Sequence, residues 1–420
     1  MTRAMKDSGI EWVGQIPEHW GFDKGKYHFT SNKYVVGVKS ADYDRLALTL
    51  TGVIHRNKED NEGLQPNGFN TYQLLRKNEL VFKLIDLQNV STSRVGLAHD
   101  TGIVSPAYVI LHANKDINPS YAEKFYLMMW YRQIFNALGD AGVRSNLNAN
   151  DLLNVRIPFP PLSEQNKIAD YLDKKCGEID AITAEIQEQI NTLEEYKKSA
   201  ISETVTKGLN PNVSMKDSGI EWIGKILANW EVDKFKYHLQ RKEVKKKPEL
   251  QVLSLYRELG VVPKDSRDDN HNVTSEDTSK YKYVKAGYFV VNKMKAWQGS
   301  VAVSDYEGIV SPAYYVYEFS DNKFYKRYFH YLLRGCYKDE FMRISGGIRV
   351  GQWDLPADKL ENMLILIPSP TEQKEIADYL DNQCSQVEEA IADKQKQIEI
   401  LEEYKKILIY EYVTGKKEIA

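Results

Sequence analysis

The 420-residue sequence contains few cysteines and no long apolar run. Its three cysteines, Cys176, Cys336 and Cys384, have neither a zinc-binding spacing nor the number needed for a disulfide framework. No stretch of about eighteen consecutive apolar residues is present, so no membrane span is expected. The first residues, MTRAMKDSGIEW, also lack the apolar segment of a secretory signal. We therefore predict a cytoplasmic protein with reduced thiols.

Catalytic motifs are equally scarce. The sequence has no phosphate-binding G-x-x-x-x-G-K-[ST] or G-x-G-x-x-G, no G-x-S-x-G and no H-E-x-x-H. The Asn/Asp-Pro-Pro-aromatic signature of amino-methyltransferases is absent, because Asn118-Pro119 and Asn210-Pro211 lack the second proline and the aromatic residue. We therefore predict a binding protein that is not itself an enzyme and that binds no metal or cofactor.

What the sequence does contain is an internal repeat. Residues 5–20 (MKDSGIEWVGQIPEHW) and 215–230 (MKDSGIEWIGKILANW) are identical at eleven of sixteen positions. Farther on, IADYLD begins at both 168 and 376, and LEEYKK begins at both 193 and 401. The chain is thus a leading segment, a globular domain and a long helix, followed by the same three parts again. Because Leu227 replaces Pro17, we expect a local change in the second leading segment and the same architecture.

Each repeat ends in a segment with the apolar spacing of a coiled coil. Residues 157–207 open with Pro158, Pro160 and Pro161, and Ser163 is a candidate N-cap for the helix that follows. Apolar residues then recur at intervals of three, four and seven, which predicts a narrow seam that needs a partner helix. The predicted seam comprises Ile168, Leu172, Ile179, Ile182, Ile186 and Leu193 in the first helix, and Ile376, Leu380, Val387 and Leu401 in the second. Lys175, Gln189 and Tyr196 interrupt the seam, and at Lys175 and Gln189 we expect the coil to loosen or to meet another protein.

Charge divides along the same boundaries. The two helical segments, 157–207 and 366–420, carry net charges of −4 and −5. The globular parts, 1–156 and 208–365, carry +2 and +4, although the whole chain carries −3. The basic globular parts give modest support for a polyanionic ligand.

The two globular parts share a scaffold and differ in their loops. Short alternating runs predict strands within 45–54, 79–85 and 107–112 in the first part, and within 250–256, 288–294 and 313–319 in the second. GIVSPAY occurs in both, at 102–108 and 308–314, and is interpreted as a corner at a sheet edge whose glycine permits an unusual turn. His28 and His238 are equivalent in the repeat, which favours a buried structural role over catalysis. The polar loops at 52–70 and 257–280 differ almost entirely, as expected of one architecture that reads two different targets.

Together, the two MKDSGIEW-x-G segments, the two GIVSPAY segments and the two P-x-x-EQ-x-x-IADYLD helices resemble the specificity subunit of a Type I restriction–modification system. The resemblance covers essentially the whole chain. It implies an α+β fold with two tandem-repeated α/β target-recognition domains, which are joined and separated by two long α-helices packed as a pseudo-two-fold symmetric, antiparallel coiled coil. The expected boundaries are 1–156 for the first domain, with its leading segment at 5–20; 157–207 for the first helix; 208–366 for the second domain, with its leading segment at 215–230; and 367–420 for the second helix.

The resemblance also implies a function and partners. Each domain would read one half of a bipartite, asymmetric site in double-stranded DNA, while the helix pair sets the spacing and docks two copies of a methyltransferase subunit. A restriction and translocation subunit would join that core. S-adenosylmethionine, ATP and Mg²⁺ are expected on those partners, which would carry the DNA adenine methyltransferase and ATP-dependent endonuclease activities. Two alternatives are a coiled-coil scaffold whose domains bind proteins and an enzyme with unrecognised motifs.

Candidate DNA-binding residues follow from chemistry, because arginine, lysine, asparagine and glutamine in polar loops pair with base edges or phosphates. Two tryptophans in the same loops could pack against a sugar or a distorted base. Lys83 and Lys293, like Arg144 and Arg349, align across the repeats, which favours phosphate contacts for these four. The candidates are Arg56, Lys83, Arg94, Arg144, Asn146, Asn148 and Asn150 in the first domain, and Arg257, Lys264, Lys293, Lys295, Trp297, Gln298, Arg349, Gln352 and Trp353 in the second.

Overall fold

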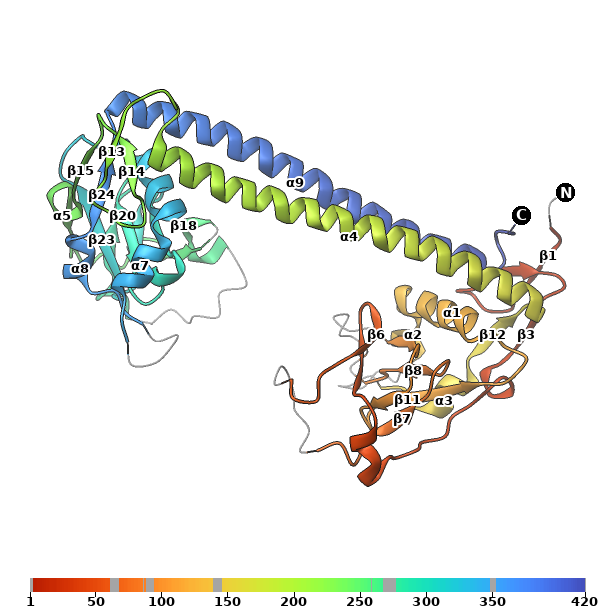
Figure 1. The fold of residues 1–420 in the computed structure, drawn as a ribbon. Helices are drawn as coiled ribbons and strands as arrows, with labels where there is room; N and C mark the ends of the chain where they lie inside the picture. Colours follow the sequence, from red (N-terminus) through yellow and green to blue (C-terminus); the bar gives the residue numbers. More distant parts are fainter. Residues whose placement is uncertain are drawn as a thin grey trace. The chain divides into compact units, whose positions relative to one another are not determined.

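The computed structural model describes residues 3–60, 68–85, 87, 94–138, 146–257, 259–266, 277–347 and 353–419. The chain divides into two compact units, each of which is described by itself (Figure 1). Unit 1 is Met1–Gln187 with Gln395–Ala420, and unit 2 is Glu188–Lys394. Each unit therefore contains one globular domain and about half of each long helix. No helix within the described ranges is long and apolar enough to cross a membrane.

The globular part of unit 1 is a set of short antiparallel strands with helices packed against them. Its elements are β1 (Met5–Asp7), β2 (Gln15–Pro17), β3 (Gly21–Lys24), η1 (Gly25–Tyr27), β4 (Phe29–Thr30), η2 (Gly37–Asp42), β5 (Leu46–Thr49), β6 (Gly52–His55), β7 (Gln73–Leu75), β8 (Leu80–Phe82), β9 (Val95–Leu97), β10 (Gly102–Val104), β11 (Val109–Ala113), α1 (Pro119–Tyr131), α2 (Ile134–Leu138), α3 (Ala149–Asn154) and β12 (Arg156–Phe159).

A four-stranded sheet in the order β4-β11-β8-β9 forms the centre of this domain, and the pairs β5-β6, β7-β10 and β3-β12 surround it. The alternation of the sequence explains the sheet: Leu80 and Phe82 join the main core, while Val81 between them faces a second apolar cluster. The predicted strand region 45–54 contains a hairpin, because β5 and β6 are separated by a turn at Leu50 and Thr51. The other predicted runs each contain one strand.

Unit 2 repeats the scaffold. Its elements are β13 (Met215–Asp217), β14 (Lys225–Leu227), β15 (Glu231–Lys234), α5 (Phe235–His238), β16 (Leu239–Arg241), β17 (Leu253–Tyr256), β18 (Gly260–Pro263), η3 (Lys264–Ser266), β19 (Lys282–Val284), β20 (Phe289–Asn292), η4 (Ala296–Gln298), β21 (Val301–Val303), β22 (Gly308–Val310), β23 (Tyr314–Phe319), α6 (Lys326–Tyr331), the π-helical turn η5 (Leu332–Cys336), α7 (Lys338–Ile344), α8 (Ala357–Glu361) and β24 (Leu364–Ile367). The sheet order β16-β23-β20-β21 matches β4-β11-β8-β9 strand for strand. The prediction of a repeated α+β domain is confirmed.

The leading segments form hairpins of identical register. Met5 pairs with Pro17 in unit 1, and Met215 pairs with Leu227 in unit 2. Replacement of the proline by leucine leaves the hairpin register unchanged, so the predicted local change was wrong, whereas the predicted architecture is retained. Trp20 and Trp230, which follow the hairpins, are almost fully buried in the two main cores.

GIVSPAY occupies the predicted position at a strand end, but its glycine has a different role. Gly102 and Gly308 lie within β10 and β22, and each faces neighbouring backbone closely. A Cβ at Gly102 would lie 2.6 Å from the Asp44 carbonyl oxygen, and one at Gly308 would lie 2.5 Å from the Gln251 carbonyl oxygen. The glycine therefore permits close packing of two backbones, and the expectation of an unusual turn was wrong.

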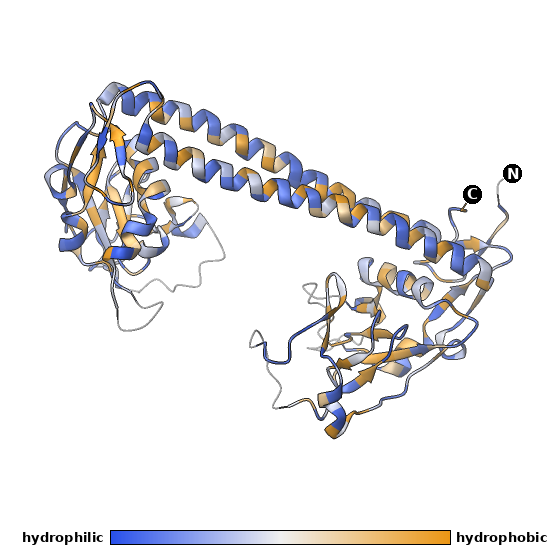
Figure 2. Cartoon of the chain, viewed as in Figure 1, coloured by the Kyte–Doolittle hydropathy of each residue, from blue (hydrophilic) through white to orange (hydrophobic). Residues whose placement is uncertain are grey.

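The long helix α4 (Leu162–Lys207, 46 residues) follows the first globular domain in the sequence, and α9 (Pro370–Val413, 44 residues) follows the second. Helix α4 begins directly after Pro161 and α9 begins at Pro370, while residues 157–159 belong to β12 rather than to the helix. Apolar residues form a stripe along each helix between polar faces (Figure 2). In unit 2 the Lys197 ammonium pairs with Glu388, and the Lys394 ammonium donates a hydrogen bond to the Gln189 side chain. A later residue of α4 therefore contacts an earlier residue of α9. The helices therefore pack antiparallel, as predicted.

Burial defines the seam of this coiled coil. Seven of the ten predicted seam residues are buried, and Leu193 and Leu401 are half-buried. Ile182 is 47% exposed, so its assignment to the seam was wrong. The seam passes through its neighbour Thr183, because the true register also includes Cys176, Ile190 and Ile398, which are buried and which the sequence pattern did not identify.

Candidate nucleic-acid interface

Three separate segments of unit 2 converge at one end of its sheet. The first is the tip of the β17–β18 hairpin, where Arg257 is exposed. The second is the loop after β20, which contains η4. The third enters at Trp353, where the Leu355 N–H donates to the Lys293 carbonyl at 3.0 Å and so fixes the third segment beside the second. Six predicted DNA-binding residues lie on these segments: Arg257, Lys293, Lys295, Trp297, Gln298 and Trp353.

Side-chain contacts join the three segments. The Arg257 guanidinium donates to the Gln298 side-chain oxygen at 3.2 Å. The rings of Trp297 and Trp353 lie 5.4 Å apart at an angle of 56°, and both are partly exposed. The Trp297 indole N–H donates to the Met294 carbonyl at 3.1 Å, which holds that ring in place. The result is a positioned aromatic pair with a guanidinium and an amide beside it.

Cationic side chains surround the aromatic pair. Lys293 lies 3.6 Å from the Asp354 carboxylate, and Lys295 is exposed on the same loop. Two further cations were not predicted. Arg334 donates to the Arg257 carbonyl oxygen, and Lys338 lies beside Gly299 at the end of η4. Sequence reasoning missed them because it searched polar loops, whereas Arg334 and Lys338 lie in the aromatic stretch 323–343.

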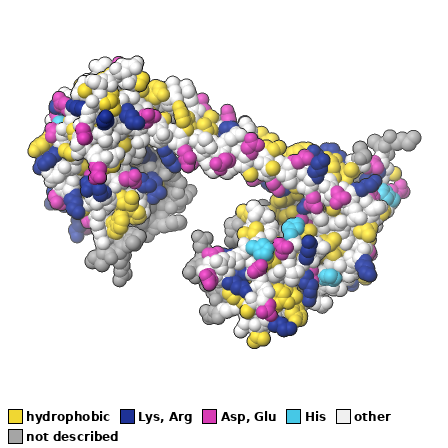
Figure 3. Space-filling model, in the orientation of Figure 1, with side chains coloured by type: hydrophobic (Ala, Val, Ile, Leu, Met, Phe, Trp, Pro, Cys, Tyr) yellow, Lys and Arg dark blue, Asp and Glu magenta, His cyan; other side chains and the backbone are white. Residues whose placement is uncertain are grey.

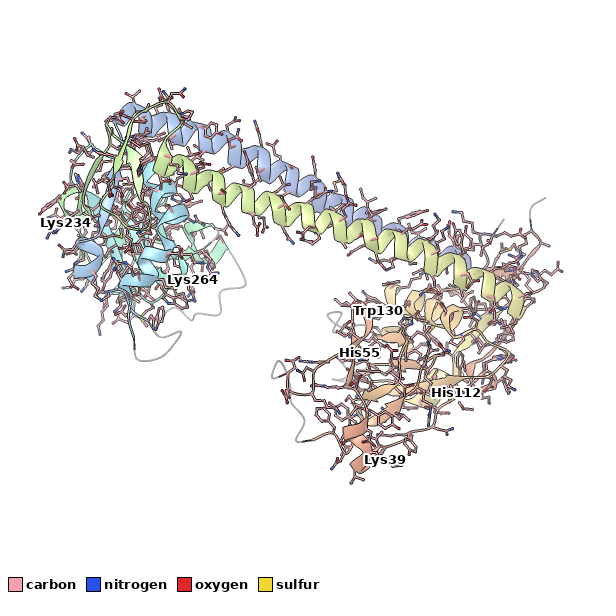
Figure 4. The ribbon with its side chains drawn as sticks, in the orientation of Figure 1. Lys39, His55, His112, Trp130, Lys234 and Lys264 are labelled. Atoms are coloured by element: carbon pink, nitrogen blue, oxygen red, sulfur yellow. The ribbon has the colours of Figure 1, made fainter. Side chains whose placement is uncertain are left out.

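Lys264 lies apart from this group. It follows β18 at the base of the hairpin, and its N–H donates to the Val252 carbonyl at 2.8 Å. Arg257 is at the opposite end of the same hairpin. Lys264 is labelled in Figure 4.

In unit 1 the candidate residues are divided between two ends of the sheet. The Lys83 N–H donates to the Arg94 carbonyl at 3.1 Å, and the Leu147 N–H donates to the Leu84 carbonyl at 3.0 Å. Lys83, Arg94 and Asn146 therefore lie at one end. Arg56 follows β6 near Asp100, toward the other end, and its Nε lies 2.7 Å from the Asp60 carboxylate.

Two of the unit 1 candidates have structural roles. Arg94 is only 1% exposed, so it is a core residue of this end and presents no surface to a ligand. The Asn148 side chain accepts hydrogen bonds from the backbone N–H groups of Asn150 and Asp151 and caps α3 in a capping box. Asn146 and Asn150 are exposed. Arg144, Arg349 and Gln352 lie outside the described residues.

The predicted equivalence of Lys83 and Lys293 was wrong. Phe82 pairs with Val109 and Val291 pairs with Tyr315, and GIVSPAY makes Val109 and Tyr315 equivalent. Lys83 therefore corresponds to Asn292, and Lys293 corresponds to Leu84. The cationic loop of unit 2 thus has no matching lysine in unit 1 at this position.

His28 and His238 are buried, as predicted. Nδ1 of each shares a hydrogen bond with an aspartate, Asp116 at 2.8 Å and Asp321 at 2.7 Å. The His28 ring also stacks on Phe159 with a centroid distance of 3.8 Å. Among the described residues, no group of three or more histidine, cysteine, aspartate and glutamate side chains is placed to hold a metal ion.

Comparison with known proteins decides the family. Residues 54–192 and 240–400 match the Methylase_S family, described as the Type I restriction modification DNA specificity domain. The chain belongs to this family. The two matched regions cover most of each globular domain and most of each long helix, so the tandem repeat is a repeat of the specificity domain.

Individual relatives agree with this assignment over part of their length. A Methanocaldococcus jannaschii protein provisionally named the type I restriction enzyme MjaX specificity subunit is 34% identical over 128 residues, which are 30% of this chain and 28% of the relative. The type I restriction enzyme MjaVIII specificity subunit of the same organism is 39% identical over 83 residues, 20% of this chain and 18% of the relative. The chain thus aligns with less than a third of these two curated relatives.

A solved structure of the type I restriction–modification system extends the likeness to the whole fold. It comes from work on the complex assembly and conformational transition of that system. The two chains are 14% identical, and the match covers 96% of this chain and 99% of that one with a TM-score of 0.68. At this identity the comparison shows that the two chains share a fold, in agreement with the predicted fold class.

Proposed function

We propose that this chain is the DNA-recognition subunit of a Type I restriction–modification complex. Each globular domain reads one half of a bipartite, asymmetric site in double-stranded DNA. The helix pair sets the spacing between the halves and docks two copies of a methyltransferase subunit, to which a restriction and translocation subunit is added. The chain works without chemistry of its own, and S-adenosylmethionine, ATP and Mg²⁺ bind to the partners.

The observation that carries this proposal is one scaffold with two different loop sets. The central sheets of the two units agree strand for strand, yet the end that holds Arg257, Trp297 and Trp353 in unit 2 has no counterpart of the same chemistry among the described residues of unit 1. A shared fold with unlike loops is what two different half-sites require, because base identity is read by side chains at loop ends and not by the sheet.

The chemistry of the unit 2 cluster suits DNA. Arginine and glutamine offer directional hydrogen bonds to base edges, and lysines beside them attract phosphates. Trp297 and Trp353 offer flat surfaces that stack on a sugar or on an unstacked base. Figure 3 shows the lysines and arginines of the globular domains interspersed with carboxylates on the face that it draws, so recognition by local loops is favoured over a broad basic surface.

The test is a methylation assay with purified components. This chain alone and the cognate methyltransferase subunit alone should leave DNA unmethylated, whereas the mixture with S-adenosylmethionine should methylate a bipartite site. Methylation by this chain alone, or equal methylation by the partner in its absence, would contradict the proposal. If the mixture bound protein partners but no DNA, a scaffold role would be favoured instead.

A further inference from the structure

An apolar stripe on α9 in unit 1 has no partner within the described chain. Ile400, Tyr404 and Ile407 are separated by four and three residues, so they lie on one side of the helix. Their exposed fractions are 59%, 51% and 46%. None of them belongs to the seam, whose α9 members here are Ile398, Leu401 and Leu408. Three large apolar side chains in a row on a helix surface mark a contact surface.

Residues of α4 extend this stripe across the coil. Asp180 pairs with Lys405 at 2.6 Å on one side of the seam, and Ile182 lies two residues farther on, which places it on the opposite side with Tyr404. Tyr171 lies on that side as well, with its ring 4.6 Å from that of Tyr412. We call the surface of Tyr171, Ile182, Ile400, Tyr404 and Ile407 the tyrosine flank.

The opposite side of the coil faces the globular domain of unit 1. A groove of about 1060 Å³ lies there, lined by Asp180, Glu402 and Lys405 from the helices and by Trp130 from α1. Trp130 is labelled beside α1 in Figure 4. The domain thus covers one side of the coil and leaves the tyrosine flank open.

Charge indicates what kind of surface fits the flank. The helix segments of unit 1, 162–187 and 395–413, carry ten carboxylates and six lysines. Two lysines beside the flank are paired: Lys175 with Glu178 at 2.7 Å, and Lys417 at the helix end with Glu411 at 2.8 Å. The complementary partner surface is an apolar ridge bordered by lysine or arginine. A second copy of this chain, whose coil is equally acidic, does not fit.

Unit 2 contains the same flank with a different composition. The repeat places Tyr379 and Tyr196 at the positions of Tyr171 and Tyr404, and they are 40% and 51% exposed. At the positions of the three isoleucines, however, unit 2 has smaller or polar residues: Ala390 for Ile182, Thr192 for Ile400 and Ser199 for Ile407. The tyrosines are therefore common to the two flanks, and the apolar area is not.

We propose that the tyrosine flank of each unit docks one methyltransferase subunit, and that the flank of unit 1 binds its copy more tightly. This inference rests on the proposed function. The shared tyrosines give both sites the same partner, and the isoleucines of unit 1 add apolar area that is buried on docking. Assembly then proceeds through a complex with one methyltransferase bound to unit 1 before the second copy binds to unit 2.

A titration of the full chain with the purified methyltransferase subunit, followed by native mass spectrometry, tests this. The triple variant Ile182→Ala, Ile400→Thr and Ile407→Ser gives unit 1 the residues of unit 2. The variant loses the contact of about three partly buried aliphatic side chains. The affinity for the first methyltransferase subunit should therefore fall about 10- to 100-fold, and the affinities for the first and second subunits should become equal. The reciprocal variant Ala390→Ile, Thr192→Ile and Ser199→Ile should strengthen the second step by a similar factor.

The control is Gln395→Ser, an exposed change on the groove side of α9, which should leave both steps unchanged. If the wild-type chain binds no methyltransferase, the proposed function fails and the inference with it. If it binds two copies but neither triple variant alters either step, the inference alone is overturned. A change confined to self-association or to binding of the restriction subunit would overturn the choice of partner. Because the reciprocal variant is expected to gain affinity for the second methyltransferase subunit, it tests the inference even if the first variant folds poorly.

Discussion

The length of α4 and α9 gives a prediction that can be worked out in base pairs. Deleting 183–189 from α4 and the repeat-equivalent 391–397 from α9 removes one whole heptad from each helix, so both seams stay in register. Each helix becomes about 10 Å shorter at ~1.5 Å per residue. If the helix pair sets the spacing, the non-specific gap of the recognised site should shorten by about three base pairs, at ~3.4 Å per base pair.

The assay is sequencing of methylated bases in a host that expresses the variant together with its methyltransferase partner. Both half-sites should be retained and only the gap should change. The matched control is deletion of four residues from each helix, 183–186 and 391–394, which rotates the seam out of register and should lower thermal stability and methylation together. Methylation by the heptad variant at the original spacing would refute the reasoning.

The remaining predictions concern single side chains. Trp353→Ala should reduce DNA binding about 5- to 100-fold in the presence of the partner, and Trp297→Ala should do the same, whereas a filter-binding assay that detects no change for either would remove the aromatic pair from the interface. Ile186→Ala should lower the free energy of unfolding by about 2–5 kcal/mol because that side chain is 7% exposed, while Ile182→Ala should change it by less than about 0.5 kcal/mol, as measured by urea denaturation. His330 should make stability depend on pH, because burial, with help from Arg334 and Arg327, lowers its pKa to about 4. Between pH ~6.5 and ~4 the unfolded chain binds more protons than the folded one, so stability should fall by up to about 3 kcal/mol as the pH is lowered through this window, and His330→Gln should remove that dependence.

Much of the fold could be predicted because the repeat and the heptads are properties of the sequence itself. The positions of IADYLD and LEEYKK fixed the equivalence of the two helices, and the prolines marked where each begins. The exact residues of the seam were harder to predict from the sequence. Ile182 is the better apolar residue, but Thr183 has the better position, because a residue's place on the seam depends on the partner helix and not on its own hydropathy.

The candidate site was predictable in part. Arg257, Trp297 and Trp353 were chosen from loop chemistry, and the structure brings their segments together. Arg94 and Asn148 were chosen on the same grounds, yet one is buried and the other caps a helix, since loop residues often serve the loop itself. The pairing of Lys83 with Lys293 failed because it extended the 210-residue offset of the leading segments to β8 and β20, where the offset is 209. Only strand register reveals that one-residue difference.

The most direct measurement is the methylated sequence itself after exchange of one domain. Residues 21–156 would be replaced by the corresponding domain of another specificity subunit, with both helices and residues 231–366 unchanged, and methylated bases would be sequenced in a host that supplies the methyltransferase. The expected result is a site in which one half is new while the other half and the gap are the same. An unchanged site, or one in which both halves change, would contradict the assignment of one half-site to each domain.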